Sequence, residues 1–222
     1  MAVTNDSALA SRIEAVARVE PWPDEKALMK KLFLGRVQRI AIRPGVFTRS
    51  LYPVLWVSSY ISANPDVYLW ESIRPLTPMP PGYRERFTNV QAAIGLEGLA
   101  HLDDWTRRTV AHAAIVTREL QATAVETPCV PADRTHVFYK YAIYAPNRDD
   151  VVKRCIRHGV DVESLHVDVC TRLPLFGTGH APAPGAERAA ETIQLPIYCS
   201  LEDSEVVRVA SVVRDAVAAA AA

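Results

Sequence analysis

The chain has 222 residues, 49% of them hydrophobic and 23% charged, and its formal net charge is zero. This length and composition predict about one globular domain with a sizeable core. A net charge of zero gives no bulk attraction to nucleic acid, so we expect no nucleic-acid partner. The four cysteines stand far apart and form no C-x-x-C pair, which favours reduced thiols in a cytoplasmic protein over disulfides or a metal site.

The N-terminal segment predicts one amphipathic helix. An Asn-Asp-Ser triplet at 5–7 offers N-cap oxygens, and apolar residues follow at helical spacing over 8–19 until Pro21 ends the pattern. The first residues turn polar at once, so we identify no signal peptide. The longest nearly apolar stretch, 51–61, is much shorter than the ~20 residues that span a bilayer.

The segment that follows is basic. Residues 26–49 contain seven basic residues and no acidic one. A basic amphipathic helix can lie on an anionic membrane surface. On a helical wheel, however, Arg36, Arg39 and Arg43 share a sector with apolar residues, so the two faces do not segregate. The pattern favours a helix packed on its own protein or on a partner, with membrane contact as the lesser alternative. Prolines at 75–81 then indicate an extended connection.

A capping box marks the start of a long helical segment. Thr88 and Gln91 can satisfy each other's backbone N–H groups. Val90, Ile94 and Leu99 are expected on the buried face of the helix, and an aspartate at 103 or 104 is expected to cap a continuation.

The last 90 or so residues alternate between strand and helix patterns. We predict strands at 135–145, 160–167 and 193–195, a loop at 174–186, and helices at 149–158, 186–191 and 202–219. In the first strand Val137, Tyr139, Tyr141 and Ile143 share a face, and Gly159 is placed as a helix C′ cap. This order predicts a small α/β layer.

One motif carries the interpretation further. The residues from Arg86 read R-F-T-N-V-Q-A-A-I-G-L, with L-D at 102–103. They resemble the R-(M/F)-(S/T)-x-(L/V)-Q-A-A-(L/I)-G-L…L-D signature of the DegT/StrS-type nucleotide-sugar aminotransferases, which are fold-type-I enzymes dependent on pyridoxal 5′-phosphate (PLP). Segments at 136–141, 159–166 and 194–206 resemble later family segments in the same order. Residues 2–6 resemble the strand and turn that follow the family's catalytic lysine.

The resemblance covers 1–20 and 82–218 and implies an α/β fold. Specifically, it implies the C-terminal small α/β domain of a fold-type-I aminotransferase, preceded by helices and a remnant of the large PLP domain. The implied division is 1–20 for the remnant, 21–81 for a helical insertion and proline-rich connection, 82–126 for a linking helical segment, and 127–222 for the small domain.

The resemblance also implies that the catalytic lysine is missing from the sequence. PLP transamination needs a lysine that forms the resting Schiff base. In the family this lysine precedes the strand within which this chain begins, and none of the five lysines here stands in such a context. We therefore expect no catalytic residue in this chain and no transamination by it alone. We also expect residues 1–60 to be less well packed than 86–218.

Four residues are candidate ligand contacts by resemblance. In related dimers the segment before the signature contacts the PLP phosphate of the partner subunit, usually through an Asn two residues before the Arg. That position is Arg84 here, and a guanidinium can grip phosphate. Arg86 matches the family Arg, with a structural ion pair as its alternative role. His166 matches a family His near the sugar-nucleotide site, with a hydrogen-bonded structural residue as its alternative role.

Arg172 follows His166 closely and is the fourth candidate. It could contact the substrate, or pair with Asp168. Four interpretations remain open for the whole chain: an inactive aminotransferase part in a homodimer, one subunit of a split enzyme whose partner supplies the lysine, a non-catalytic interaction module, and a membrane-surface protein.

Overall fold

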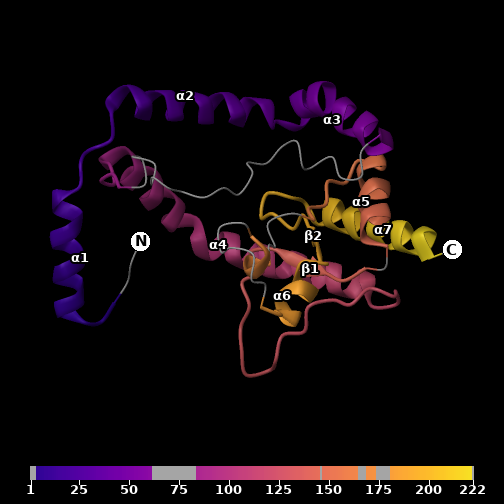
Figure 1. Cartoon of the computed structure of the whole chain (residues 1–222). Coiled ribbons are helices and arrows are strands. Elements are labelled where there is room, and N and C mark those ends of the chain that lie inside the picture. The colour runs from indigo at the N-terminus through magenta and orange to yellow at the C-terminus, as the bar shows by residue number, and fades with distance from the viewer. Residues whose placement is uncertain (1–3, 62–83, 146, 165–168, 174–180, 222) are drawn as a thin grey trace. The chain divides into compact units, whose positions relative to one another are not determined.

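The structure is a computed structural model that describes residues 4–61, 84–145, 147–164, 169–173 and 181–221 (Figure 1). The described elements are mostly helical, with one small sheet and a single 3-10 turn. In chain order they are α1 (Ser7–Val19), α2 (Glu25–Ala41), α3 (Pro44–Ile61), α4 (Asn89–Leu120), β1 (Tyr141–Ile143), α5 (Arg148–Arg157), η3 (Cys170–Arg172), α6 (Pro184–Ala189), β2 (Ile193–Leu195) and α7 (Asp203–Ala221).

The described residues belong to two compact units. One unit takes its residues from Met1–Pro44 and Pro75–His101, and the other from Gly45–Arg74 and Leu102–Ala222. The first contains α1, α2 and the start of α4. The second contains almost all of α3, the rest of α4 and every later element.

The start of each of the first two helices, α1 and α2, is determined by an N-cap aspartate. The Asp6 carboxylate accepts hydrogen bonds from the backbone N–H groups of Ala8 (2.8 Å) and Leu9 (3.1 Å), as the N-cap triplet predicts. Asp24 does the same for Ala27 at the start of α2 (2.8 Å). The basic segment is helical, and it forms α2 and the beginning of α3.

The core of the second unit is built on an antiparallel pair of strands. Tyr141 of β1 lies opposite Leu195 of β2, and Ile143 lies opposite Ile193. These side chains are buried against α5, α7 and the end of α4. Fully burying one such aliphatic side chain stabilises the fold by about 1.5–3 kcal/mol. The small α/β layer predicted from the sequence is therefore present, as a two-stranded sheet packed with helices.

Helix α5 ends in the glycine cap that the sequence predicts. Gly159 has φ of +73°, and its N–H donates to the carbonyl of Ile156 (3.0 Å). The N–H of Val160 donates to the carbonyl of Cys155 (2.9 Å), which completes a Schellman motif. Arg208 of α7 adds a hydrogen bond to the Gly159 carbonyl (3.0 Å).

Helix α3 attaches to the same end of α5. The Tyr52 hydroxyl lies within hydrogen-bonding distance of the carbonyls of Ile156 (3.2 Å) and Arg157 (3.4 Å). The Arg157 guanidinium donates to the Ser59 carbonyl (2.9 Å) and stacks on the Tyr60 ring at 4.0 Å. Since the last carbonyls of a helix lack intrahelical partners, α3 helps satisfy the end of α5.

The first predicted strand is wrong over most of its length. Only Tyr141–Ile143 is a strand, because Phe138 has φ of 49° and breaks the extended run. The His136 ring accepts a hydrogen bond from the Phe138 N–H (2.8 Å), which makes a local turn. Consequently Val137 and Tyr139 are exposed and do not share the buried face of Tyr141.

Three other predicted elements also differ from the structure. In the predicted strand at 160–167, the described residues form only an isolated bridge between Glu163 and Gln194; 165–167 lie outside the described residues. Helix α4 runs without a break through 103 and 104. Helix α6 begins at Pro184, inside the predicted loop, because proline suits the first helical position.

Packing differs sharply along the chain. Every buried hydrophobic residue in the described part of the chain lies between Ala113 and Val217, and the described residues of 1–60 bury only the polar Ser59. This confirms that 1–60 packs less well than 86–218. The predicted buried face of the first half of α4 is wrong, since Val90, Ile94 and Leu99 are 44–61% exposed. Among the described residues, no helix is long and apolar enough to cross a membrane.

The cap at Gly159 gives a stability prediction. Gly159→Ala should lower the free energy of unfolding by about 1–2 kcal/mol, because an L side chain is disfavoured at positive φ. An added Cβ would also lie 3.4 Å from Arg208. Urea denaturation followed by circular dichroism measures the change.

Gly185→Ala is the matched control. A Cβ at Gly185 would meet nothing within 4 Å, and the residue lies in α6 with no positive φ. We expect no loss of stability there. Equal losses in the two variants would contradict the role of the Gly159 backbone.

Candidate functional site

Two of the site residues predicted from the sequence, Arg84 and Arg86, lie in the segment just before α4. This segment leads into the capping box, in which the Thr88 N–H donates to Gln91 Oε1 (2.9 Å) and the Gln91 N–H to Thr88 Oγ1 (3.3 Å). The box fixes where α4 begins and therefore where the preceding arginines stand.

The same segment runs beside the end of α1. The backbone N–H of Arg86 donates to the carbonyl of Pro21 (2.8 Å). The Arg86 guanidinium lies over the Trp22 ring, with Cζ 4.9 Å from the ring centroid. Arg84 meets Glu20, with Nε 3.1 Å and Nη2 2.7 Å from the same carboxylate oxygen. Three contacts of different kinds thus join residues 20–22 to 84–86.

A cavity of about 530 Å³ opens between these two segments; we call it the Arg84 cavity. Trp22 and Phe87 line part of it. Its charged lining comprises three arginines and three glutamates, so its formal charge is zero; these residues are Glu14, Arg18, Glu20, Arg84, Glu85 and Arg86. Two of the arginines have carboxylate partners, since Arg18 pairs with Glu14 (2.6 Å) and Arg84 with Glu20 (2.7 Å).

The two candidate arginines differ in what surrounds them. The Arg84 side chain is 67% exposed, so its ion pair stabilises the fold by at most about 1 kcal/mol. The Nε atom of Arg86 is buried and has no hydrogen-bond partner in the described part of the chain. The alternative role of Arg86 as an ion-pair partner is not seen among the described residues; its contact is the Trp22 ring.

The other two candidates lie elsewhere. His166, and with it Asp168, is outside the described residues. Arg172 belongs to the second unit, where its guanidinium pairs with Glu187 of α6 (2.9 Å). The structure therefore brings Arg84 and Arg86 to one cavity and ties Arg172 to a different element.

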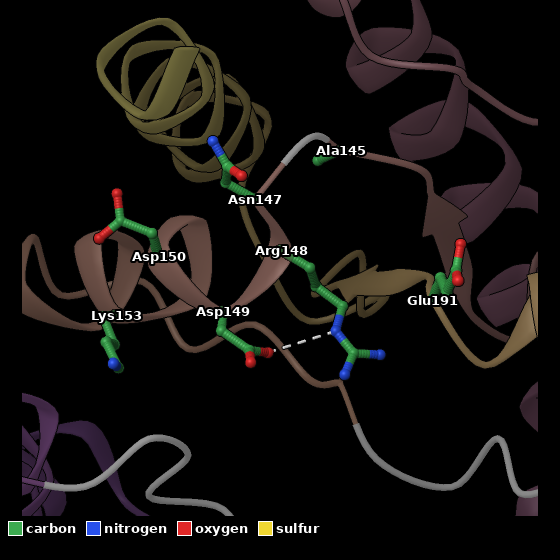
Figure 2. Close-up of a pocket in the computed structure, with 7 residues that line it drawn as sticks. All are labelled: Ala145, Asn147, Arg148, Asp149, Asp150, Lys153 and Glu191. Carbon is green, nitrogen blue, oxygen red and sulfur yellow. Dashed lines mark hydrogen bonds and ion pairs between the residues drawn. The ribbon is translucent and has the colours of Figure 1, made fainter. Parts of the chain in front are cut away.

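A second cavity, which the sequence analysis did not predict, lies at the start of α5 (Figure 2). It has a volume of about 740 Å³, and its lining includes Arg148, Asp149, Asp150 and Lys153. Asn147, at φ 51°, precedes the helix in the left-handed region and donates through Nδ2 to the Ala220 carbonyl (2.6 Å). Arg148 is held by Asp149 (3.4 Å) and by the Ala190 carbonyl. The only sequence signal was an asparagine before two aspartates, which is ordinary at a helix start.

The five lysines occupy three kinds of environment. Lys26, Lys30 and Lys31 are exposed on α2. Lys140 is paired with Glu163 at 2.5 Å, with both side chains about 30% exposed. Lys153 lines the open cavity at the start of α5. Among the described residues, no group of histidine, cysteine or carboxylate side chains could hold a metal ion.

Comparison with known proteins places the chain in a class. Solved sugar aminotransferases of fold type I share its fold over 59–70% of its length. The aminotransferase TlmJ from Streptoalloteichus hindustanus has a TM-score of 0.58 and 29% identity, over 70% of this chain and 42% of that chain. DesV from S. venezuelae, solved in complex with a ketimine intermediate, has a TM-score of 0.53 and 26% identity, over 62% and 39%.

The family model of the DegT/DnrJ/EryC1/StrS aminotransferase family matches residues 61–214, and the chain belongs to this family. A dTDP-3-amino-3,4,6-trideoxy-α-D-glucose transaminase from Micromonospora megalomicea is 34% identical over 148 residues, which are 62% of this chain and 39% of that protein. A pleiotropic regulatory protein from Geobacillus stearothermophilus is 34% identical over 131 residues, 56% and 35%. The chain thus spans well under half the length of the curated relatives it matches.

The thiols of the second unit differ in their expected reactivity. Burial raises the pKa of Cys155 to about 12, so at pH 8 its thiol stays protonated and unreactive. Cys129 and Cys170 are exposed. At pH 8 an aromatic disulfide reagent should label these two within minutes and Cys155 only after unfolding in urea. Mass mapping reads the sites, and labelling of Cys155 at the rate of Cys129 would refute the assignment.

Proposed function

We propose that these residues are the C-terminal part of a PLP-dependent sugar aminotransferase that transfers an amino group to a keto sugar nucleotide. Family membership and the likeness to sugar transaminases support this proposal. Among this chain's own residues, the observation that supports the proposal is the Arg84 cavity. This cavity is lined by Arg86 of the family signature and by Arg84, whose guanidinium already binds the Glu20 carboxylate.

The residues present fit one part of PLP. PLP, when bound, supplies the carbonyl that exchanges amino groups and a ring that withdraws electrons. Arg84 offers two N–H donors to one carboxylate oxygen, and the same donors suit a phosphate oxygen. Arg86, stacked on Trp22 and hydrogen-bonded to Pro21, fixes the backbone from which Arg84 extends. We assign a phosphate contact to Arg84 and a supporting role to Arg86.

We further propose that these 222 residues do not catalyse transamination by themselves. A Schiff-base lysine needs a sheltered position and a depressed pKa or an adjacent base. The Lys140 ammonium is engaged by Glu163, and the lysines of α2 are exposed. Lys153 lines a solvent-facing cavity together with Asp149, Asp150 and Glu191. The lysine would then come from polypeptide outside these residues, in the same subunit or in a partner chain.

His166 and Arg172 remain proposed contacts for the sugar nucleotide. Arg172 keeps two-fifths of its side chain covered and holds Glu187, so substrate phosphate would compete with that carboxylate. The division of the chain at 20, 81 and 126 and the cytoplasmic location are likewise proposals. Reduced thiols support the latter, since all four cysteines are free.

The exposed apolar residues favour a second, non-catalytic function as an interaction module. Between Val90 and Trp105, α4 exposes six large hydrophobic side chains: Val90, Ile94, Leu96, Leu99, Leu102 and Trp105. Apolar surface of this extent marks a contact with other protein. A second copy of the chain, or the lysine-bearing polypeptide, would cover it. The exposed basic residues of α2 keep a membrane surface as the remaining alternative.

PLP titration of the purified chain tests the catalytic proposal. Borohydride reduction followed by mass mapping should find no single lysine carrying one cofactor per chain, because the α2 lysines are exposed, Lys140 is paired with Glu163 and Lys153 faces a solvent-open cavity. Scattered, substoichiometric labelling of exposed lysines is the expected background.

One stoichiometric adduct on Lys140 or Lys153, with the absorbance band of an internal Schiff base, would sink the proposal. Lys140→Arg and Lys153→Arg are matched variants that keep the charge. Either variant should leave the background labelling of the α2 lysines unchanged.

A further inference from the structure

We propose that Glu20 is a positioning residue of the Arg84 cavity. Its carboxylate holds the Arg84 guanidinium in place and accepts hydrogen bonds from Nε and Nη2 until a phosphate-bearing ligand displaces it. This inference rests on the proposed phosphate contact of Arg84. It goes beyond that contact in two ways. It assigns a role to the C-cap residue of α1, which no family motif singles out, and it states that Glu20 and phosphate compete for Arg84, which sets the affinity of the cavity for anions.

The position of Glu20 in its helix is the first observation. Glu20 is the C-cap residue of α1, with φ −68° and ψ 146°. A negative charge at a helix C-terminus is unfavourable, because the carbonyl end of the helix dipole is itself negative. The Glu20 carboxylate therefore does not stabilise α1. Its partner is the Arg84 guanidinium, 64 residues away in sequence.

The geometry of the pair is the second observation. Both Nε and Nη2 of Arg84 reach one oxygen of Glu20, at 3.1 and 2.7 Å. The Glu20 side chain is 18% exposed, whereas that of Arg84 is 67% exposed. The carboxylate thus stands on the protein side of the pair, and Arg84 keeps an open side toward solvent from which another anion can approach.

The contacts beside the pair are the third observation. The hydrogen bond from the Arg86 N–H to the Pro21 carbonyl and the stacking of Arg86 on Trp22 join the same two segments without using Glu20. The segments therefore stay opposite each other when the Glu20 charge is removed. What changes is the cavity, whose formal charge goes from zero to plus one and whose Arg84 donors become available.

A carboxylate and a phosphate oxygen accept from the same kind of donor, so they compete for the Nε and Nη2 edge of Arg84 that Glu20 occupies. A phosphate that displaces Glu20 breaks the ion pair, so its binding free energy is less favourable by roughly the free energy that the pair contributes. For a pair whose guanidinium is largely exposed this amounts to about a threefold to fivefold weaker affinity. Glu20 therefore weakens anion binding while keeping Arg84 preset for it.

The test titrates the full 222-residue chain with inorganic phosphate, followed by phosphorus NMR or calorimetry. Glu20→Gln should bind phosphate about threefold to fivefold more tightly than the parent chain. Glu20→Asp, which keeps the charge, should stay near the parent. Glu20→Gln combined with Arg84→Gln should lose the gain. Circular dichroism checks that α1 remains helical in each variant.

Glu14→Gln is the matched control. Glu14 lines the same cavity and pairs with Arg18 at 2.6 Å, so its removal changes the cavity charge by the same amount without freeing Arg84. We expect less than about a twofold change there, because the Glu14 side chain is 63% exposed, so that solvent and salt screen its charge. An equal gain in Glu14→Gln and Glu20→Gln would reduce the effect to net charge and overturn the proposal.

The remaining outcomes separate this inference from the proposed function. If Arg84→Gln abolishes phosphate binding but Glu20→Gln leaves it unchanged, the phosphate contact stands and the positioning role of Glu20 is wrong. If Arg84→Gln binds phosphate as well as the parent chain, or none of the chains binds it, both fail. Repeating the titration with PLP and with pyridoxal, which lacks the phosphate, should show the Glu20→Gln gain for PLP alone.

Discussion

The pairing of β1 with β2 is the constraint on which the second unit of this chain depends. Each strand has only three residues, and alone neither would be stable in water. Their register sets Tyr141, Ile143, Ile193 and Leu195 into one apolar cluster that α5, α7 and the end of α4 also enter. Helix α3 then attaches through the end of α5, whose last carbonyls need partners.

The first unit is organised by polar and aromatic contacts instead. Helices α1 and α2 bury no side chain, so their stability rests on the N-caps at Asp6 and Asp24 and on local pairs such as Arg18 with Glu14. Isolated helices of this length are marginal in water. The link from 20–22 to 84–86 is the most specific tertiary feature there, and it coincides with the start of the family signature.

The two units pack differently, and the chain covers only part of the length of its relatives. The relatives it matches are more than twice as long as the aligned segment. Large apolar side chains are exposed along the first half of α4, and exposed apolar surface is typical of a contact with other protein. The Arg84 cavity balances three arginines with three glutamates, and two of these arginines are paired with carboxylates.

The sequence by itself determined the features that depend on near neighbours in the chain. The capping box at Thr88, the N-cap at Asp6 and the left-handed cap at Gly159 all follow from side chains within a few residues, and the family signature is a run of adjacent residues. The tertiary structure decided what depends on distant residues. The turn at Phe138 ended a strand that its β-branched and aromatic composition favoured, and Val90 is exposed despite its helical spacing. The pairing of Arg84 with Glu20 joins positions 64 residues apart, and no local pattern encodes which carboxylate a guanidinium will meet.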